Sequence, residues 1–471
     1  MASRARSGKQ AKSDLVIGLL SLLLYLLLGL SFFFCLSINN IFLRVINRTL
    51  ATTLLTFCAM SVAMHAVYGG YDVGRRKPKP VISAMIAGTV ITDLVTFLQL
   101  QIMNVNDHYN DHLTLFGPDA LYLLLCMFIQ CLLIIIFVRV GNQLYFSMNP
   151  PRSCLVILGS PHQEKALREK IGRYQLQWRV DDVVLYNVPD LESHIEKADV
   201  VFLGQLPEGA KFALLKMCYD DRKDVMCKAQ LQDIMLCNAN PAIVDDAAFL
   251  AMEYNKITSG QRLVKRMGDV VISLLALLLL SPFIVLIAIL IRAEDGGAVI
   301  FRQSRLTADG RIFTIRKFRT MTQQADVPDT QRSSTVDDPR ITKIGAFLRR
   351  FRLDEVPQFF NILIGDMSLV GPRPEMMANV LRYKIELPAF VYREKMKAGL
   401  TGYAQIEGRY NTSAEDKLML DMMYIESFSL WLDIKLLLRT FTIFTKADST
   451  QGFITAPDRK INHKEEEKKR L

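Results

Sequence analysis

The sequence lacks the cysteine patterns that are typical of zinc sites and disulfide-rich domains. Its eight cysteines include no C-x-x-C pair, and none of them follows Cys237. We therefore interpret them as reduced, and mostly as packing residues. A nucleic-acid-binding motif is also absent, although the formal net charge of +10 would suit nucleic acid, anionic lipid or a phosphate-bearing substrate. We therefore expect no nucleic-acid partner.

Long hydrophobic runs, by contrast, are abundant in the first third of the chain. Residues 15–36 form an uncharged apolar run, and similar runs follow near residues 50–68, 81–103 and 120–138. About 20 apolar residues are enough for a helix to cross the hydrocarbon core of a membrane. No small-residue cleavage site follows the first run, so we interpret it as an anchor and not as a signal peptide. Residues 15–140 are thus predicted to form four transmembrane helices.

Basic residues predict how these helices are oriented. Residues 104–118 contain no Lys or Arg, whereas two other segments carry four basic residues each: Arg4, Arg6, Lys9 and Lys12 before the first run, and Arg75, Arg76, Lys77 and Lys79 between the second and third. Basic loops remain on the cytoplasmic side. The pattern predicts a multi-pass protein of the bacterial inner or plasma membrane, with the N-terminus (residues 1–14) in the cytoplasm. Asp93, inside the third run, is expected to face the helix bundle.

The texture of residues 141–255 is that of a soluble α/β domain. Segments 154–159 and 198–204 have the apolar character of buried strands, and residues 164–174 have the pattern of a helix between strands. This order predicts a small Rossmann-like sheet. The turn after the first strand reads GSPHQE from Gly159 and has no G-x-G-x-x-G pattern, so we interpret the domain as degenerate, without a dinucleotide site.

Residues 265–292 contain a fifth apolar run, which poses a problem of parity. A fifth crossing would place the rest of the chain outside the cell, yet both ends of this run are basic: Lys265 and Arg266 on one side, Arg292, Arg302 and Arg305 on the other. Both ends are therefore expected in the cytoplasm. Ser281 and Pro282 stand in the middle, where proline removes a backbone donor. We predict a re-entrant helix-break-helix over about residues 267–291, with a kinked spanning helix as the alternative.

Three later segments have less specific patterns. Residues 322–338 have the composition of an exposed loop. Residues 429–446 alternate apolar and basic side chains, which suits a helix in the membrane interface or a core helix equally well. The tail, residues 447–471, is predicted to be solvated.

Residues 256–446 carry a series of motifs that together resemble the bacterial monotopic phosphoglycosyl transferases. The motifs, in order, are KRMGDVV, VIFRQSR, KFRTM, DPRITKIGAFLRRFRLDEVPQFFNILIGDMSLVGPRPE and GLTGYAQIEGRYN. The four upstream helices and the Rossmann-like domain are similar to the large members, which initiate exopolysaccharide, capsule or O-antigen synthesis. The resemblance implies transfer of a sugar-1-phosphate from a UDP-sugar to undecaprenyl phosphate, with release of UMP. It also implies a mainly α-helical cytosolic α/β catalytic domain attached to the re-entrant helix.

Asp354 and Glu355 are the candidate catalytic residues. Pro357 is compatible with a first helical turn, which would place both acids near a helix N-terminus, where the macrodipole favours an ionised carboxylate. Neighbouring helical residues point in different directions, so different roles are expected. The resemblance implies that Asp354 attacks the β-phosphate and forms a covalent phosphosugar intermediate. Glu355 would coordinate Mg²⁺, assist the acceptor phosphate, or do both.

Several basic residues are candidates for binding phosphate. Arg373 stands between two prolines in GPRPE, which suits a guanidinium held ready for phosphate or for the uridine end. Lys317 and Arg319 of KFRTM are further candidates, with an ordinary surface role as the alternative. Arg352 is grouped with Arg340, Arg349 and Arg350, which could contact substrate or lipid headgroups.

Two departures from the family pattern concern local loops and leave the chemistry intact. Thr307 stands where glycine is usual, and Ala298 stands where proline is common. The C-terminal motif is most similar to members that use hexose nucleotides such as UDP-glucose or UDP-galactose. Large members of the family also suggest a homodimer. The alternative function is a membrane-bound, nucleotide-sugar-sensing scaffold with an inactive transferase domain, against which the intact acid pair and GPRPE motif argue.

Overall fold

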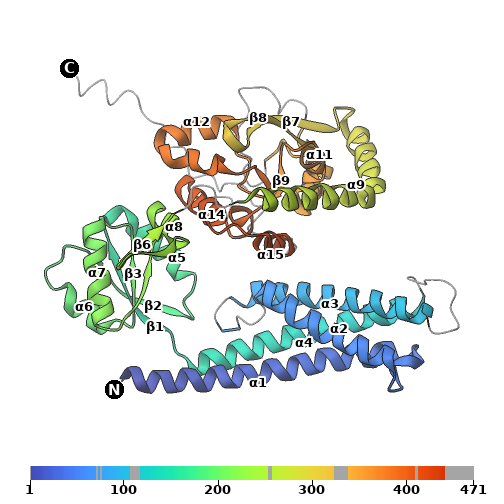
Figure 1. Ribbon diagram of the computed structural model, residues 1–471, viewed down its shortest axis with the longest axis horizontal. Coiled ribbons are helices and arrows are strands. Elements are labelled where there is room, and N and C mark those ends of the chain that lie inside the picture. The colour runs from blue at the N-terminus through green and yellow to red at the C-terminus, as the bar shows by residue number, and fades with distance from the viewer. Residues whose placement is uncertain are drawn as a thin grey trace. The chain divides into compact units, whose positions relative to one another are not determined.

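The computed structural model describes residues 2–69, 73–74, 77–106, 117–252, 257–322, 338–408 and 412–440 (Figure 1). The chain divides into two compact units, Met1–Asp233 and Ile234–Leu471. The predicted loop at 322–338 lies almost wholly outside the described residues, as do the tail after residue 446, Arg75 and Arg76.

The first unit begins with four long helices, α1 (Ala2–Ser37), α2 (Arg48–Tyr68), α3 (Pro78–Asn106) and α4 (Pro118–Met148). The chain turns between α1 and α2 through a short 3₁₀ helix, Ile41–Leu43, and the Asn47 side chain accepts a hydrogen bond from the Leu50 N–H at the start of α2. The four helices share one apolar core, in which Phe32, Met85 and Ile134 are fully buried. By length and composition all four could cross a membrane, as predicted. Their topology remains a prediction.

Asp93 is fully buried between these helices and has a partner that the sequence did not reveal. Its carboxylate accepts a hydrogen bond of 3.3 Å from the Gln130 amide on α4. The same amide donates to the Leu28 carbonyl on α1 at 3.1 Å. This arrangement agrees with the expectation that Asp93 faces its helix neighbours.

A four-stranded parallel sheet follows, with the order β2-β1-β3-β4 (Figure 1). The strands are β1 (Arg152–Leu158), β2 (Trp178–Leu185), β3 (Val200–Leu203) and β4 (Asp224–Cys227), joined by α5 (Glu164–Gly172), α6 (Leu191–Lys197) and α7 (Glu208–Asp220). This confirms the predicted α/β domain with a parallel sheet. The turn after β1 is closed, because the Gln163 amide exchanges two hydrogen bonds with the Gln205 main chain. A Cβ atom on Gly159 would lie 2.2 Å from the Gln205 carbonyl oxygen.

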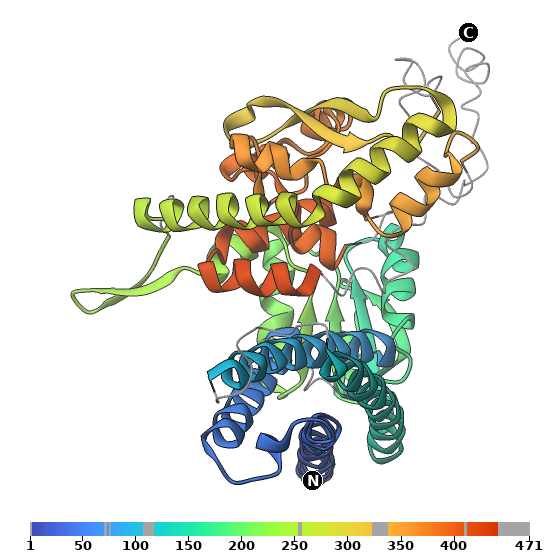
Figure 2. The same ribbon diagram turned by 90° about the vertical axis from the view of Figure 1, so that its right-hand side faces the viewer.

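The second unit begins within helix α8 (Leu231–Cys237). A hairpin of β5 (Asn240–Val244) and β6 (Ala247–Ala251) follows in the chain, and then a long helix, α9 (Ser259–Asp295). A capping box of Thr258 and Gln261 begins α9, and Gly296 ends it in the left-handed conformation with φ 72°. Pro282 lies inside the helix, and the Ser281 hydroxyl donates to the Leu278 carbonyl at 2.8 Å. Figure 2 shows that α9 changes direction part-way along its length. Proline in a helix interior accounts for such a bend.

Most apolar side chains of α9 are not covered by the rest of the protein. Leu275, Leu279 and Phe283, for example, are exposed. The helix is long and apolar enough to enter a membrane. The re-entrant path predicted for residues 267–291, in which the helix enters and leaves the membrane by the same face, remains a prediction.

The rest of the unit combines short strands with many helices. Strands β7 (Ile300–Leu306) and β8 (Ile312–Phe318) form an antiparallel hairpin. Strands β9 (Ser368–Val370) and β10 (Gly399–Thr401) form a parallel pair. The helices are α10 (Lys343–Arg350), α11 (Gln358–Ile364), α12 (Met377–Glu386), α13 (Tyr403–Ile406), α14 (Ala414–Glu426) and α15 (Leu430–Thr440), with 3₁₀ helices η6 (Leu353–Glu355) and η7 (Pro388–Lys395). The predicted helix at 429–446 corresponds to α15, in which Leu432 and Leu436 are buried and Trp431 is exposed.

Candidate active site

The acid pair lies in the short 3₁₀ helix η6, between α10 and α11. Arg352 begins this turn in the left-handed conformation, with φ 53°, which is uncommon for a residue with a side chain. Pro357 is the N-cap of α11, so Asp354 and Glu355 precede that helix instead of lying in its first turn. The sequence-based expectation of a nearby helix start was therefore correct, and its exact register was not.

Glu355 is surrounded by positive charge. Its Oε1 atom accepts a hydrogen bond of 2.8 Å from Lys317 Nζ, and its Oε2 atom is 3.8 Å from Arg352. Burial alone would raise the pKa of this carboxyl. The charges of Lys317, Arg352 and Arg373 outweigh burial and hold the pKa of Glu355 below its ordinary value. Glu355 is thus a firmly ionised carboxylate.

Asp354 responds in the opposite direction. Burial raises the pKa of Asp354 above its ordinary value, although the charge of Lys317 opposes this effect. The neighbouring negative charge of Glu355 raises it further. Two adjacent carboxyls whose pKa values are pushed apart can take different chemical roles. The opposite pKa shifts are compatible with different roles for the two acids, which remain a prediction.

Arg373 is held close to the acid pair by the loop after β9. Burial lowers the pKa of Arg352 and the positive charge of Arg373 lowers it further, and the same charge helps to lower the pKa of Glu355 against the effect of burial. Gly371, at the start of this loop, packs so tightly against the chain before β10 that a Cβ atom there would lie 2.3 Å from the Lys397 carbonyl oxygen. Glycine is required by this close approach.

The structure separates the other predicted cations. Lys317, near the end of β8, contacts the acid pair, whereas Arg319 is buried in an ion pair with Asp295 at the end of α9. Arg340 pairs with Asp338 at 2.7 Å, and Arg349 donates to the Thr320 hydroxyl at 2.8 Å. Arg349 also lowers the pKa of Asp354 through its charge. Lys317, Arg352 and Arg373 thus gather around the acids, and Arg319 takes part in a separate contact.

Sequence reasoning missed Asn361, which fastens α11 to strand β8. Asn361 is fully buried, and its amide donates to the Thr314 carbonyl at 2.7 Å and accepts from the Arg316 N–H at 3.0 Å. The next residue on β8 is Lys317. Asn361 therefore sets the position of the strand that carries Lys317 relative to the helix that follows the acids. A polar residue in the apolar run FFNILI was the available signal.

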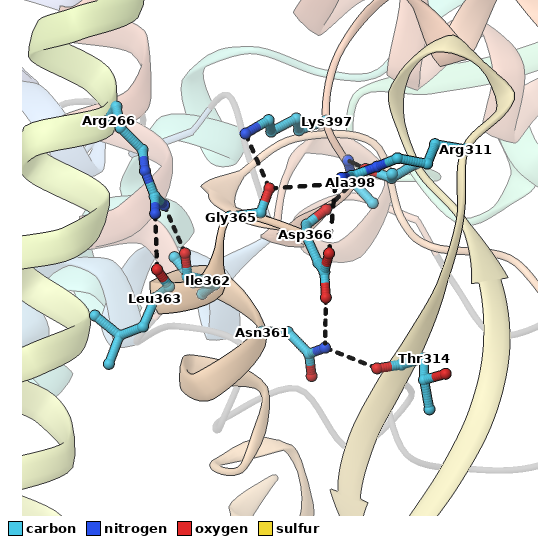
Figure 3. A network of polar contacts seen from close by, with 11 residues as sticks. Arg266, Arg311, Thr314, Asn361, Ile362, Leu363, Gly365, Asp366, Lys397 and Ala398 are labelled. Atoms are coloured by element: carbon cyan, nitrogen blue, oxygen red, sulfur yellow. Dashed lines mark hydrogen bonds and ion pairs between the residues drawn. The ribbon is translucent and has the colours of Figure 1, made fainter.

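Positive side chains hold the other end of α11. Arg266, on α9, donates to the carbonyls of Ile362 and Leu363 at 2.6 and 2.7 Å, and Lys397 donates to the Gly365 carbonyl at 2.9 Å (Figure 3). Cations complement the partial negative charge at a helix C-terminus. The apolar helix α9 is thus connected directly to the helix that begins beside the acid pair.

No group of three or more His, Cys, Asp and Glu side chains gathers as a metal site among the residues that the structure describes. This does not conflict with magnesium, because Mg²⁺ is commonly bound by one or two carboxylates together with substrate phosphates and water. Asp354 and Glu355 supply two neighbouring carboxyls, of which Glu355 is held ionised. The residues present therefore fit a magnesium ion that binds together with a phosphate-bearing substrate.

Comparisons with known proteins match the second unit. The family model "Bacterial sugar transferase" matches residues 260–447. A UDP-glucose:undecaprenyl-phosphate glucose-1-phosphate transferase of Caulobacter vibrioides is 40% identical over 190 residues, which are 39% of this chain and 71% of that protein. The chain belongs to the bacterial sugar transferase family. The acid pair, Lys317 and Arg373 all lie within the matched residues.

Two other relatives of this chain are much longer than the region in which they match it. A UDP-glucose:undecaprenyl-phosphate glucose-1-phosphate transferase of Escherichia coli is 43% identical over 194 residues, or 40% of this chain and 41% of that protein. A UDP-N-acetylgalactosamine-undecaprenyl-phosphate N-acetylgalactosaminephosphotransferase of Aeromonas hydrophila is 40% identical over 186 residues, or 39% of this chain and 44% of that protein. The chain thus spans less than half the length of these two relatives in the match.

Proposed function

We propose that this protein transfers a hexose-1-phosphate from a UDP-sugar to undecaprenyl phosphate and releases UMP, as the first membrane step of a bacterial exopolysaccharide, capsule or O-antigen pathway. The observation that carries the proposal is the acid pair surrounded by Lys317, Arg352 and Arg373, in which the pKa of Asp354 is raised and the pKa of Glu355 is lowered. Related family members whose names specify the same type of reaction support it.

In the first step, an Asp354 oxygen attacks the β-phosphorus of the UDP-sugar. A bond forms between that oxygen and phosphorus while the bond from phosphorus to the bridging oxygen breaks, and UMP leaves with the electron pair. The product is an acyl phosphate, in which the sugar phosphate is joined to Asp354 by a mixed anhydride. Carboxylates are established nucleophiles at phosphorus, and this step transfers no proton.

In the second step, a phosphate oxygen of undecaprenyl phosphate attacks the same phosphorus. The bond to Asp354 breaks, which regenerates the carboxylate and leaves the sugar diphosphate on the lipid. In both steps an anion approaches another anion. Lys317, Arg352 and Arg373 reduce this repulsion because their positive charges lie where negative charge develops.

Glu355 is the residue that would hold Mg²⁺, with donor phosphates as further ligands. Bound there, the ion would supply additional positive charge to the transferring phosphoryl group. Glu355 remains ionised over a wide pH range, which suits a metal ligand. The lipid acceptor would arrive from the membrane side through the apolar surface of α9, and the nucleotide sugar from the cytoplasm.

The donor sugar is proposed to be glucose or galactose. The names of relatives include glucose transferases and a UDP-galactose-lipid carrier transferase of Erwinia amylovora, which is 35% identical over 217 residues, or 43% of this chain and 45% of that protein. A homodimer and a cytoplasmic catalytic domain are parts of the same proposal that rest on the sequence alone.

The test is UMP release by purified protein from a panel of UDP-sugars, with Mg²⁺ and undecaprenyl phosphate. We expect release with one hexose donor and none with Asp354→Asn. Asp309→Asn is a matched control, because Asp309 is an exposed carboxylate in a left-handed conformation that asparagine also adopts. Full activity of Asp354→Asn would contradict the mechanism, and silence of the wild type across the panel would favour the scaffold alternative.

A further inference from the structure

Charged side chains hold the main chain of Arg373 and of the proline that follows it. An Arg393 nitrogen donates to the Arg373 carbonyl at 2.6 Å, and the Arg373 N–H donates to the Asp421 carboxylate. On the next residue, Arg305 donates to the Pro374 carbonyl at 3.1 Å. Three charged residues from different elements thus fix three consecutive peptide units, from Pro372 to Glu375.

Arg393 and Asp421 also form an ion pair with each other. The Arg393 nitrogen and an Asp421 oxygen are 2.6 Å apart, and the two residues are only 5% and 1% exposed. The guanidinium of Arg393 packs over the ring of Phe390 at 4.7 Å. The pair therefore belongs to the interior of the domain, between η7 and α14, and its charges have little access to water.

Stability alone does not explain such a pair. Removing two charges from water costs about as much as their attraction returns, and well-packed apolar residues in the same place are often equally stable or better. What an apolar pair cannot do is bind the N–H and the carbonyl of Arg373. The contacts with the main chain are thus the property that distinguishes these two charged residues from apolar replacements.

The Arg373 side chain contrasts with its main chain. Its guanidinium forms no hydrogen bond or ion pair with the part of the chain that the structure describes, although its charge acts on Glu355. A fixed main chain between two prolines with an uncommitted guanidinium is the arrangement expected of a preorganised anion-binding arginine.

We propose that Arg393 and Asp421 are positioning residues, which hold the Arg373 main chain so that its guanidinium meets the diphosphate of the donor beside Glu355. The inference rests on the proposed function and adds two residues to it. Neither residue touches the reacting atoms, so both act through Arg373. Glu375, two residues after Arg373, pairs with Lys417 at 3.0 Å and so adds a further contact to the same loop.

The test replaces the ion pair by apolar residues in the double variant Arg393→Met with Asp421→Leu. We expect the melting temperature in detergent to stay close to that of the wild type, because the buried charges are removed together. We expect kcat/KM for UMP release to fall about 10- to 100-fold, towards the value of Arg373→Ala. Wild-type kcat/KM in a folded double variant would overturn the proposal.

Combining these changes with Arg373→Ala separates positioning from general structural damage. If the pair acts through Arg373, the apolar replacement costs less than about twofold in kcat/KM when Arg373 is already alanine. Fully additive losses would overturn the proposal. Arg393→Met with Asp421→Asn serves if the first double variant does not fold, because it removes both charges and the donor to the Arg373 carbonyl while it keeps the shape of residue 421, and the same cycle applies to it.

Lys384→Met is the control ion-pair variant. Lys384 pairs with Glu394 at 2.7 Å on neighbouring elements of the same domain and does not contact Arg373. We expect its kcat/KM to equal that of the wild type. A wild-type protein that releases no UMP would overturn the proposed function, whereas an active wild type with additive variants would overturn only the positioning role.

Discussion

Asp354 and Glu355 are neighbours in the chain with opposite electrostatic environments. Lys317 contacts Glu355 directly, and burial dominates at Asp354. A nucleophile must be ionised, while a carboxyl with a raised pKa binds a proton at pH values where an ordinary aspartate, with a pKa of about 3.9, has lost it. The nucleophilic form of Asp354 is therefore lost at a higher pH than usual as the solution is acidified.

We predict an acid limb in the pH profile of kcat/KM at a pH above the ordinary pKa of aspartate. Lys317→Met should move this limb to still higher pH, because the charge of Lys317 lowers the pKa of Asp354. The rate of UMP release by the wild type and by Lys317→Met, measured between about pH 4 and 8, checks both statements. A limb that lies near pH 4, or that moves to lower pH in Lys317→Met, would contradict the assignment of Asp354.

At the scale of single elements, α11 connects the acid pair to two other parts of the domain. Asn361 ties it to strand β8, and Arg266 ties its C-terminal end to α9. Both contacts use main-chain groups as partners, so they hold the elements in register without depending on the partner's side chain. The relative position of Lys317 and Glu355 depends on this framework.

We predict that Asn361→Asp lowers both stability and turnover. An aspartate cannot donate to the Thr314 carbonyl, so two acceptors would face each other in the interior. The expected cost is about 1–3 kcal/mol in the free energy of unfolding, together with a lower kcat. Chemical denaturation and UMP release measure the two effects. An unchanged kcat in the folded variant would show that Asn361 does not position Lys317.

The path of α9 leads to another prediction. If the helix enters and leaves by one face, both of its flanks are cytoplasmic. Single cysteines introduced at Arg262 or Arg302 in a cysteine-free background should resist an impermeant thiol reagent in intact cells and react after permeabilisation. Both positions are exposed in the structure. Labelling of Arg302→Cys alone in intact cells would instead indicate a spanning helix.

Local patterns in the sequence predicted the elements better than the contacts between them. The apolar runs gave four long helices, and the motif around Pro357 indicated the acids before a helix. The partners of Asn361 and Asp93 are 37 or more residues away in sequence, and no local pattern encodes such distances. Arg393 and Asp421 are closer in sequence, at positions 393 and 421, but no local pattern pairs them either.

At the scale of the whole molecule, the two units contribute differently to the proposed reaction. All the residues assigned to it lie within residues 260–447, which match the family model. The closed turn at Gly159 leaves the Rossmann-like domain without an open phosphate loop. We therefore regard the upstream unit as accessory to the chemistry.

We predict that a truncated protein lacking residues 1–255 keeps UMP release when it is purified with lipid or detergent. Because α9 remains, the truncated chain still has its apolar helix. The measurement compares kcat/KM for UMP release, per mole of folded protein, between the truncated protein and the full chain. A complete loss of release in a folded truncated protein would assign a direct role to the upstream unit.

The most direct test of the covalent intermediate on Asp354 mixes the protein with UDP-hexose in the absence of the lipid acceptor and measures both UMP release and the mass of the protein. We predict that UMP is released in a single equivalent per protein molecule and that mass spectrometry finds a hexose phosphate on the peptide that contains Asp354. Asp354→Asn should give neither signal. If UMP forms only after undecaprenyl phosphate is added, with no adduct on the protein, the transfer is direct and the role assigned to Asp354 is wrong.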